Sequence, residues 1–267
     1  MSTVEKALAL LRFFDEERTE LGLSELRRLS KRDKATTYRY LAALESAGLL
    51  ERAGEGPKYC IGPAVLRLAR LRERSMPRLS VVGSVLSDLA AATGETSHAA
   101  QLEGARLTTL DHRESSAHGT RVKIDISDLP LHATASGLAA VAFGPAQLRA
   151  AALDGLHRFT ADTAATPAAL EQAIAEARHT GIAETAGTFE EDVYSFAAPV
   201  FGGTGGLAGT LAVAAVQARV GPGNSLTIRR ALVAACRETT RRWGGQVPAP
   251  VDTLWAATLS QVTEMPA

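Results

Sequence analysis

Residues 22–62 constrain the fold of this chain more than any other segment. A short helix is expected over 25–30 and a longer one over 34–47, with only a tight turn between them. Two strand-like segments, 49–52 and 58–61, then flank a Gly-Glu-Gly-Pro turn. The capping and stop residues expected for the helices are Ser24, Asp33 and Gly48.

This order of elements predicts a winged helix-turn-helix, which places its second helix in the major groove of DNA. On the helix over 34–47, Thr37, Leu41 and Leu44 share the expected inward face. The outward face carries Thr36, Arg39 and Ala43, flanked by Ala35 and Tyr40. Small side chains let a helix sit deep in a groove, and Arg39 can reach a guanine edge or a phosphate. The predicted DNA-contacting residues are Ser24, Lys34, Ala35, Thr36, Thr37, Arg39, Tyr40, Arg52 and Lys58.

Charge is distributed in a way that agrees with a DNA-binding N-terminal part. The whole chain has no net charge, but residues 1–78 hold 16 Lys and Arg against 11 Asp and Glu. The remainder holds 13 basic and 18 acidic residues. A basic first third joined to an acidic remainder indicates that only the first part meets phosphate.

The cysteine content and the apolar segments of the chain indicate the compartment in which the protein is expected. The only cysteines, Cys60 and Cys236, lie far apart, so no disulfide framework or zinc-finger spacing exists, as is typical of a reducing cytoplasm. The apolar stripe at 4–14 is interrupted by charges and predicts a helix rather than a signal peptide. No segment has the roughly 18–20 apolar residues that span a bilayer, so a cytoplasmic protein with no membrane partner is expected.

The rest of the chain predicts an α+β fold with a central antiparallel sheet. We divide it into a linker helix at 63–78, a large domain at 79–246 and a C-terminal tail at 247–267, after a DNA-binding domain at 1–62. Leu254 to Val262 can also form a short packed helix. Helices are expected at 79–92, 135–143, 167–179 and 224–243, and strands at 96–103, 106–112, 122–126, 182–185, 194–201 and 207–217.

Several ordered motifs resemble the IclR family of bacterial transcriptional regulators. They are Ser-Thr-Val-Glu-Lys-Ala-Leu at 2–8, Gly-Leu-Ser-Glu-Leu at 22–26, Thr-Thr-Tyr-Arg-Tyr-Leu at 36–41, Leu-Glu-Ser-Ala-Gly-Leu-Leu-Glu-Arg at 44–52, Thr-Gly-Glu-Thr at 93–96, Leu-Pro-Leu-His-Ala-Thr-Ala at 129–135 and Ala-Ala-Pro-Val-Phe at 197–201. The resemblance implies a winged helix-turn-helix, a linker helix and a GAF-like effector-binding domain. It also implies that Lys34, Thr36 and Arg39 match the family's DNA-contacting positions.

By the same resemblance, the chain is a transcription factor, and repression is the commoner outcome in the family. The implied partners are double-stranded operator DNA, further copies of the chain as a dimer or dimer of dimers, and a small organic effector such as a carboxylate or aromatic catabolite. The implied effector pocket is lined by Leu129, Leu131, His132, Ala133, Thr185, Val193, Ser195, Ala212 and Ala214. The motif at 136–138 is Ser-Gly-Leu where many members have a lysine at the third position, so effector identity is the least transferable property.

Other chemistry has weaker support in the sequence. His98, Asp111, His112, His118 and His132 invite a metal-site interpretation but show no HxH or HxxxH pair, so no metal or other cofactor is expected. The glycine-rich segment 203–209 leads into strand-like sequence, which indicates a hairpin turn rather than a dinucleotide loop. No nucleophile motif is present, so we expect no catalytic residues. The alternative function is a metabolite-sensing or enzymatic protein whose N-terminal module makes protein contacts.

Overall fold

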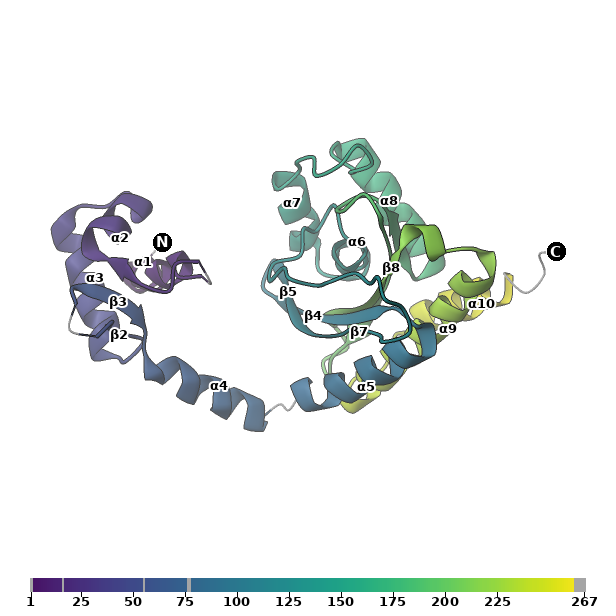
Figure 1. The fold of residues 1–267 in the computed structure, drawn as a ribbon, viewed down its shortest axis with the longest axis horizontal. Helices are drawn as coiled ribbons and strands as arrows, with labels where there is room; N and C mark the ends of the chain where they lie inside the picture. Colours follow the sequence, from purple (N-terminus) through teal and green to yellow (C-terminus); the bar gives the residue numbers. More distant parts are fainter. Residues whose placement is uncertain (1, 16, 55, 76–77, 262–267) are drawn as a thin grey trace. The chain divides into compact units, whose positions relative to one another are not determined.

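The fold was analysed in a computed structural model, which describes residues 2–15, 17–54, 56–75 and 78–261. The chain forms two compact units, residues 1–77 and 78–267 (Figure 1). Among the described residues, no helix combines the length and apolar character needed to cross a membrane.

The N-terminal unit is a small helical domain with a three-stranded sheet. Its elements are α1 (Thr3–Leu8), the 3-10 helix η1 (Ala9–Phe13), β1 (Leu21–Gly22), α2 (Leu23–Ser30), α3 (Lys34–Ser46), β2 (Leu50–Arg52), β3 (Lys58–Ile61) and α4 (Pro63–Ser75). The sheet order is β1-β3-β2, with antiparallel pairs. Leu10, Leu26 and Leu41 are fully buried at the centre of this unit, where the helices meet the sheet.

Two details of this unit differ from the sequence prediction. The cap of α2 is Gly22 rather than Ser24, because the Glu25 carboxylate accepts a hydrogen bond from the Gly22 N–H at 2.8 Å. The two-residue strand β1, which is too short for a periodic signal, completes the wing sheet by pairing Leu21 with Tyr59. Asp33 caps α3 as predicted, and its Oδ1 accepts a hydrogen bond from the Thr36 N–H at 2.8 Å.

The C-terminal unit is built on a five-stranded antiparallel sheet of order β5-β4-β8-β7-β6. The strands are β4 (Thr96–Glu103), β5 (Arg106–Arg113), β6 (Ala183–Ala186), β7 (Val193–Phe201) and β8 (Leu207–Val216). The helices are α5 (Arg78–Thr93), α6 (Ala135–Phe143), α7 (Ala146–Asp154), α8 (Pro167–Thr180), α9 (Pro222–Arg242) and α10 (Ala249–Gln261), with the 3-10 helix η2 (Gln217–Arg219).

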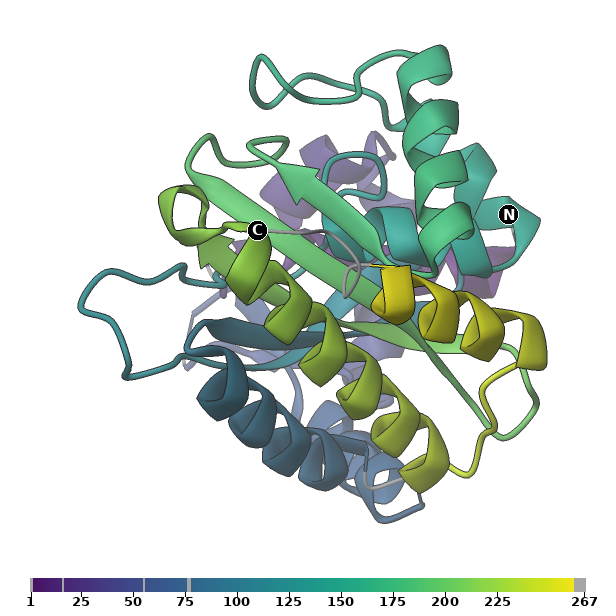
Figure 2. The same cartoon turned by 90° about the vertical axis from the view of Figure 1, so that its right-hand side faces the viewer.

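Helices cover both faces of this sheet (Figures 1 and 2). One core packs α5, α9 and α10 against one face around Leu86, Phe196 and Leu232. The other packs α6, α7 and α8 against the opposite face around Leu138 and Ile174. Because both faces are covered, the central strands are buried along almost their whole length rather than at alternate residues.

Small residues bring α6 close to its neighbours. Every residue from Ala135 to Ala142 is buried, as expected for a helix that is apolar all round. A Cβ at Gly137 would lie 2.4 Å from the Pro130 carbonyl oxygen, so only glycine lets the 129–132 turn pack against the helix. The first turn of α6 is thereby held against the residues at 129–132 that precede it.

Three parts of this unit were not predicted correctly. Residues 122–126 form no strand, because hydrogen bonds from side chains hold them instead of a backbone ladder. The Thr96 hydroxyl donates to the Val122 carbonyl at 2.6 Å, and the Thr109 hydroxyl donates to the Ile126 carbonyl at 2.6 Å. Helix α7 was missed. The expected tail at 247–267 contains α10, a packed helix that begins before the one considered at 254–262, and its Trp255 is fully buried.

Candidate functional site

The outer surface of α3 carries four of the nine side chains predicted to contact DNA. Lys34, Ala35 and Arg39 are exposed, and Thr36 is half-buried beside the Asp33 cap. Hydrogen bonds from the backbone and side chain of Thr36 lower the pKa of the Asp33 carboxyl. Asp33 therefore stays ionised at the N-terminus of α3. This face presents one guanidinium, one ammonium and small side chains, as a groove-reading helix requires.

Thr37 and Tyr40 are corrections to the predicted DNA-contacting set. The Thr37 side chain is fully buried, and its hydroxyl donates to the Asp33 carbonyl at 2.8 Å. Tyr40 is 6% exposed and belongs to the core of the unit, whereas Tyr38 is 54% exposed. Tyr38 therefore replaces Tyr40 as the aromatic side chain on the outer surface of α3.

The remaining predicted residues of this unit lie on other elements. Ser24 is exposed on α2 and Lys58 is exposed on β3. Arg52 is engaged within the unit: its Nε lies 3.2 Å from a Glu45 carboxylate oxygen, and its guanidinium lies 4.1 Å from the centre of the Tyr59 ring. An arginine held in this way is less available for phosphate than Lys58.

The turn before α3 adds cationic residues that the sequence prediction missed. Arg27, Arg28 and Lys31 are exposed at the end of α2. Lys31 adopts a left-handed conformation with φ of 52°, which ends α2 and turns the chain toward α3. In helix-turn-helix proteins the first helix crosses the DNA backbone, so this basic run suits phosphate contacts. Its signal, an Arg-Arg pair followed by Lys-Arg, was visible in the sequence.

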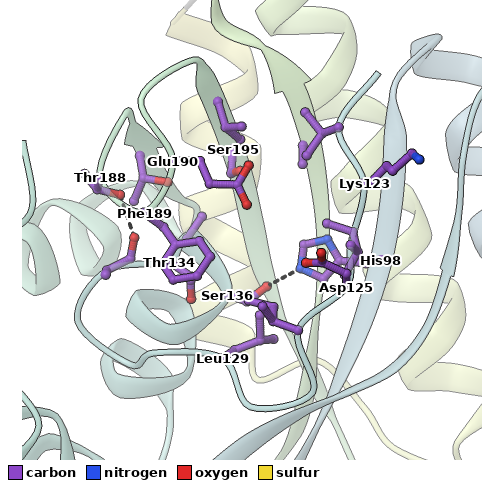
Figure 3. A pocket seen from close by; sticks show the side chains of 18 residues that line it. His98, Lys123, Asp125, Leu129, Thr134, Ser136, Thr188, Phe189, Glu190 and Ser195 are labelled. Carbon is purple, nitrogen blue, oxygen red and sulfur yellow. Dashed lines mark hydrogen bonds between the residues drawn. The ribbon is translucent and has the colours of Figure 1, made fainter. Parts of the chain in front are cut away.

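A separate cavity lies in the C-terminal unit, between the sheet, the first turn of α6 and the loops that follow β5 and β6 (Figure 3). It contains about 540 Å³ of space not filled by atoms, part of it open to solvent. The hydroxyl of Thr188 donates to the Ala133 carbonyl at 2.6 Å, and this bond holds the loop after β6 against the start of α6. The hydroxyl of Thr163 donates to the Thr188 carbonyl at 2.7 Å and supports the same loop from outside.

The structure places some of the predicted effector residues at this cavity and others away from it. Its lining includes Leu129, Ala133, Thr185, Val193, Ser195 and Ala214. Leu131 and Ala212 do not line it, because both pack in the core between the sheet and α6. These two residues are therefore corrections to the predicted lining.

His132 also lies outside the lining. Its Nε2 is 2.8 Å from the His157 carbonyl oxygen, and its ring stacks on Phe159 with centroids 5.8 Å apart. Phe159 in turn contacts the ring of Phe189, which does line the cavity. Burial lowers the pKa of His132, so the neutral ring is favoured. His132 therefore supports the wall of the cavity through other residues.

The sequence prediction missed most of the polar lining and the whole 122–126 segment. His98 on β4 is 5% exposed, and its Nε2 lies 3.1 Å from the hydroxyl of Ser136 on α6. Desolvation, with a smaller contribution from His112, lowers the pKa of His98 to about 4. The missed lining residues are His98, Val122, Lys123, Ile124, Asp125, Ile126, Thr134, Ala135, Ser136, Thr188, Phe189 and Glu190.

The histidines considered for a metal site do not assemble into one. Within residues 2–15, 17–54, 56–75 and 78–261, no group of three or more His, Cys, Asp or Glu side chains is placed to hold an ion. His98 and His112 lie opposite each other on the paired strands β4 and β5. His132 is instead hydrogen-bonded to the His157 carbonyl.

The two units together define a class: a winged helix-turn-helix joined to an α+β domain that contains a cavity. The pattern described as the IclR helix-turn-helix domain matches residues 3–54, and that of the bacterial transcriptional regulator IclR C-terminal domain matches residues 74–241. The chain belongs to the IclR family and is a DNA-binding transcriptional regulator.

Individual relatives agree with this assignment. The transcriptional regulator XynR of Escherichia coli is 28% identical over 247 residues, which cover 91% of this chain and 98% of XynR. An IclR-type regulator from Silicibacter sp. TM1040 has a crystal structure with a TM-score of 0.88 and 44% identity, covering 93% of this chain and 99% of that one. An IclR homologue from Microbacterium hydrocarbonoxydans, crystallised with 4-hydroxybenzoate, has a TM-score of 0.69 at 24% identity and covers 90% and 99% of the two chains.

Proposed function

We propose that this regulator binds its operator through α3 and that a small organic effector in the C-terminal cavity changes its DNA affinity. The observation that carries the proposal is the presence of both surfaces in one chain: an exposed, cationic recognition helix and a cavity with a buried imidazole in its wall. Repression of catabolic or metabolic genes is the proposed outcome, in keeping with the E. coli repressor that shares the family name.

The proposed DNA-bound form is a symmetric dimer or a dimer of dimers. Two α3 helices related by a two-fold axis would read half-sites one helical turn, or a multiple of it, apart. An effector can change the operator affinity only to the extent that it binds the DNA-competent and incompetent arrangements with different affinity. The proposed DNA contacts, taken from the residues predicted in the sequence, are Lys34, Ala35, Thr36 and Arg39 on α3 and Lys58 on β3. Ser24 on α2 would lie at the edge of this DNA-binding surface.

Lys34 provides a test of the phosphate contacts. We expect Lys34→Ala to reduce the slope of log affinity against log salt by about 0.9, since one fewer counterion is released. The measurement is fluorescence anisotropy of labelled operator at several salt concentrations, and Lys6→Ala on α1 serves as the control of equal charge. An unchanged slope for Lys34→Ala, or an equal reduction for the control, would remove Lys34 from the interface.

The effector part is tested by repeating the anisotropy titration in the presence of candidate metabolites. We expect at least one small organic compound to change the operator affinity fivefold or more, as a coupling of at least about 1 kcal/mol requires. Filling the cavity with Ala214→Phe should abolish this response while leaving the effector-free affinity unchanged. A response that survives this substitution would place the effector elsewhere.

A further inference from the structure

The polar groups at the inner end of the cavity are uncharged. The Nδ1 atom of His98 is buried and has no hydrogen-bond partner among the described residues, while its Nε2 faces the Ser136 hydroxyl at 3.1 Å. Thr185 and Ser195 add hydroxyl groups to the same lining. With a pKa of about 4, His98 is neutral near pH 7 and offers hydrogen bonding without charge. A charged ligand group placed here would lose its hydration without gaining a counter-ion.

The mouth of the cavity is acidic. Asp125 and Glu190 are both exposed residues of the lining. Partial desolvation of the Glu190 carboxyl, together with the negative charge of Asp125, raises the pKa of Glu190. Lys123 is the single Lys or Arg among the described lining residues. In Figure 3 the Glu190 carboxylate faces the pocket, whereas the Lys123 side chain extends away from it. An anionic ligand would therefore meet two carboxylates with little compensation.

The N-terminus of α6 is a second feature, besides the Lys123 ammonium, that favours negative charge. Ala135 and Ser136 begin this helix at the cavity wall, and a helix N-terminus carries roughly half a positive charge. The hydroxyl oxygen of a ligand can accept a hydrogen bond from a backbone N–H group in the first turn of this helix without bringing a net charge. This half charge and the single ammonium of Lys123, which extends away from the pocket, together remain smaller than the two carboxylate charges at the mouth, so the balance favours an uncharged oxygen.

Apolar side chains form the remaining wall. Val122, Ile124, Ile126, Leu129, Phe189 and Val193 surround the polar groups, and Phe189 is held by its contact with Phe159. A ligand that fills this space needs an apolar or aromatic body, since such a wall offers it no hydrogen bonds.

We propose that the cavity binds an uncharged hydroxyl compound with an apolar or aromatic body, and that it discriminates against carboxylates. The inference rests on the proposed function in that it takes this cavity as the effector site. The family resemblance implied a carboxylate or an aromatic catabolite, and the inference departs from the first of these, because Asp125 and Glu190 came to the cavity only through the fold. The hydroxyl group binds at the His98 end, and the apolar body lies against Phe189.

The test compares size-matched probes by isothermal titration calorimetry with the full chain. The pairs are 4-hydroxybenzyl alcohol with 4-hydroxybenzoate, and 1-butanol with butyrate. In at least one pair we expect saturable binding of the alcohol that is tenfold or more tighter than that of the carboxylate. Tighter or equal binding of the carboxylates, or saturable binding of neither alcohol, would overturn the proposal.

Variants separate the two halves of the argument. The double variant Asp125→Asn with Glu190→Gln should raise carboxylate affinity about tenfold and change alcohol affinity less than threefold. Glu191→Gln, a neighbouring acidic residue outside the lining, is the matched control and should change neither. His98→Phe should weaken the alcohol about tenfold, and Thr185→Val provides a second, less disruptive test of the polar end. An alcohol-to-carboxylate ratio unchanged by the double variant would overturn the role of the acidic mouth.

Operator binding, measured on the same protein samples, distinguishes this inference from the proposed function. Wild-type protein that prefers the carboxylates while responding to them on DNA contradicts the inference alone. Wild-type protein that prefers the alcohols without any change in DNA affinity supports the inference and contradicts the coupling of cavity to DNA.

Discussion

Trp255→Ala is expected to lower the free energy of unfolding of the C-terminal unit by about 3–5 kcal/mol, because it removes a fully buried indole and leaves a cavity. Trp255 packs in the core formed by α5, α9 and α10, and its Nε1 donates to the Gly181 carbonyl at 2.8 Å. Urea unfolding followed by far-UV circular dichroism measures the change.

Trp255→Phe is the matched control for this effect. It keeps most of the buried ring but leaves the Gly181 carbonyl without its donor, so a loss of only about 1–3 kcal/mol is expected. If Trp255→Ala cost less than about 1 kcal/mol, α10 would behave as the tail expected at 247–267 and not as the packed helix also considered there. The large loss would show that this helix is an integral part of the C-terminal unit.

The second large effect concerns Arg39, the exposed guanidinium on α3. Arg39→Glu should weaken operator binding about 100-fold, because a contact of about 1–3 kcal/mol is lost and a carboxylate is placed against DNA. Arg39→Ala should cost less, and if Arg39 reads a base it should also relax the preference at one base pair in each half-site. Anisotropy titrations with the operator and its single-base variants measure both effects.

Arg12→Glu controls for the change in overall charge. Arg12 is exposed on η1, outside α3, and its substitution alters the net charge by the same amount. We expect it to weaken binding several-fold less than Arg39→Glu does. Equal losses from the two variants would mean that Arg39 acts only through the general field of the domain.

The sequence predicted the N-terminal unit well because its signals are local. Asp33 marks the start of α3, because its carboxylate accepts a hydrogen bond from the Thr36 N–H three residues along the chain. Gly48, with φ of 70°, follows the end of this helix. Periodicity was less reliable at the edge of the helix. Tyr38 and Tyr40 lie on either side of the boundary between the inward and outward faces of α3. Only the packing of Tyr40 in the core of the N-terminal unit shows that its side chain is buried.

The cavity was harder to predict because its residues meet only through tertiary contacts. His98 lies in the middle of a buried strand, and nothing in the local sequence indicates that Ser136 is 3.1 Å from its ring. Residues 122–126 have strand-like composition, but hydroxyl groups of Thr96 and Thr109 hold them as an irregular cavity wall. His132 belongs to a recognisable motif, yet the motif does not show that its ring turns toward His157.

The most direct test of the central claim, that α3 reads specific DNA, is a gel shift of the full chain with the DNA upstream of its own gene. Excess nonspecific competitor is present, and Arg39→Glu is run beside the wild type. The account predicts a wild-type shift that survives the competitor and a shift lost in Arg39→Glu. Absence of any binding at low salt, even to nonspecific DNA, or an undiminished shift with Arg39→Glu, would contradict it.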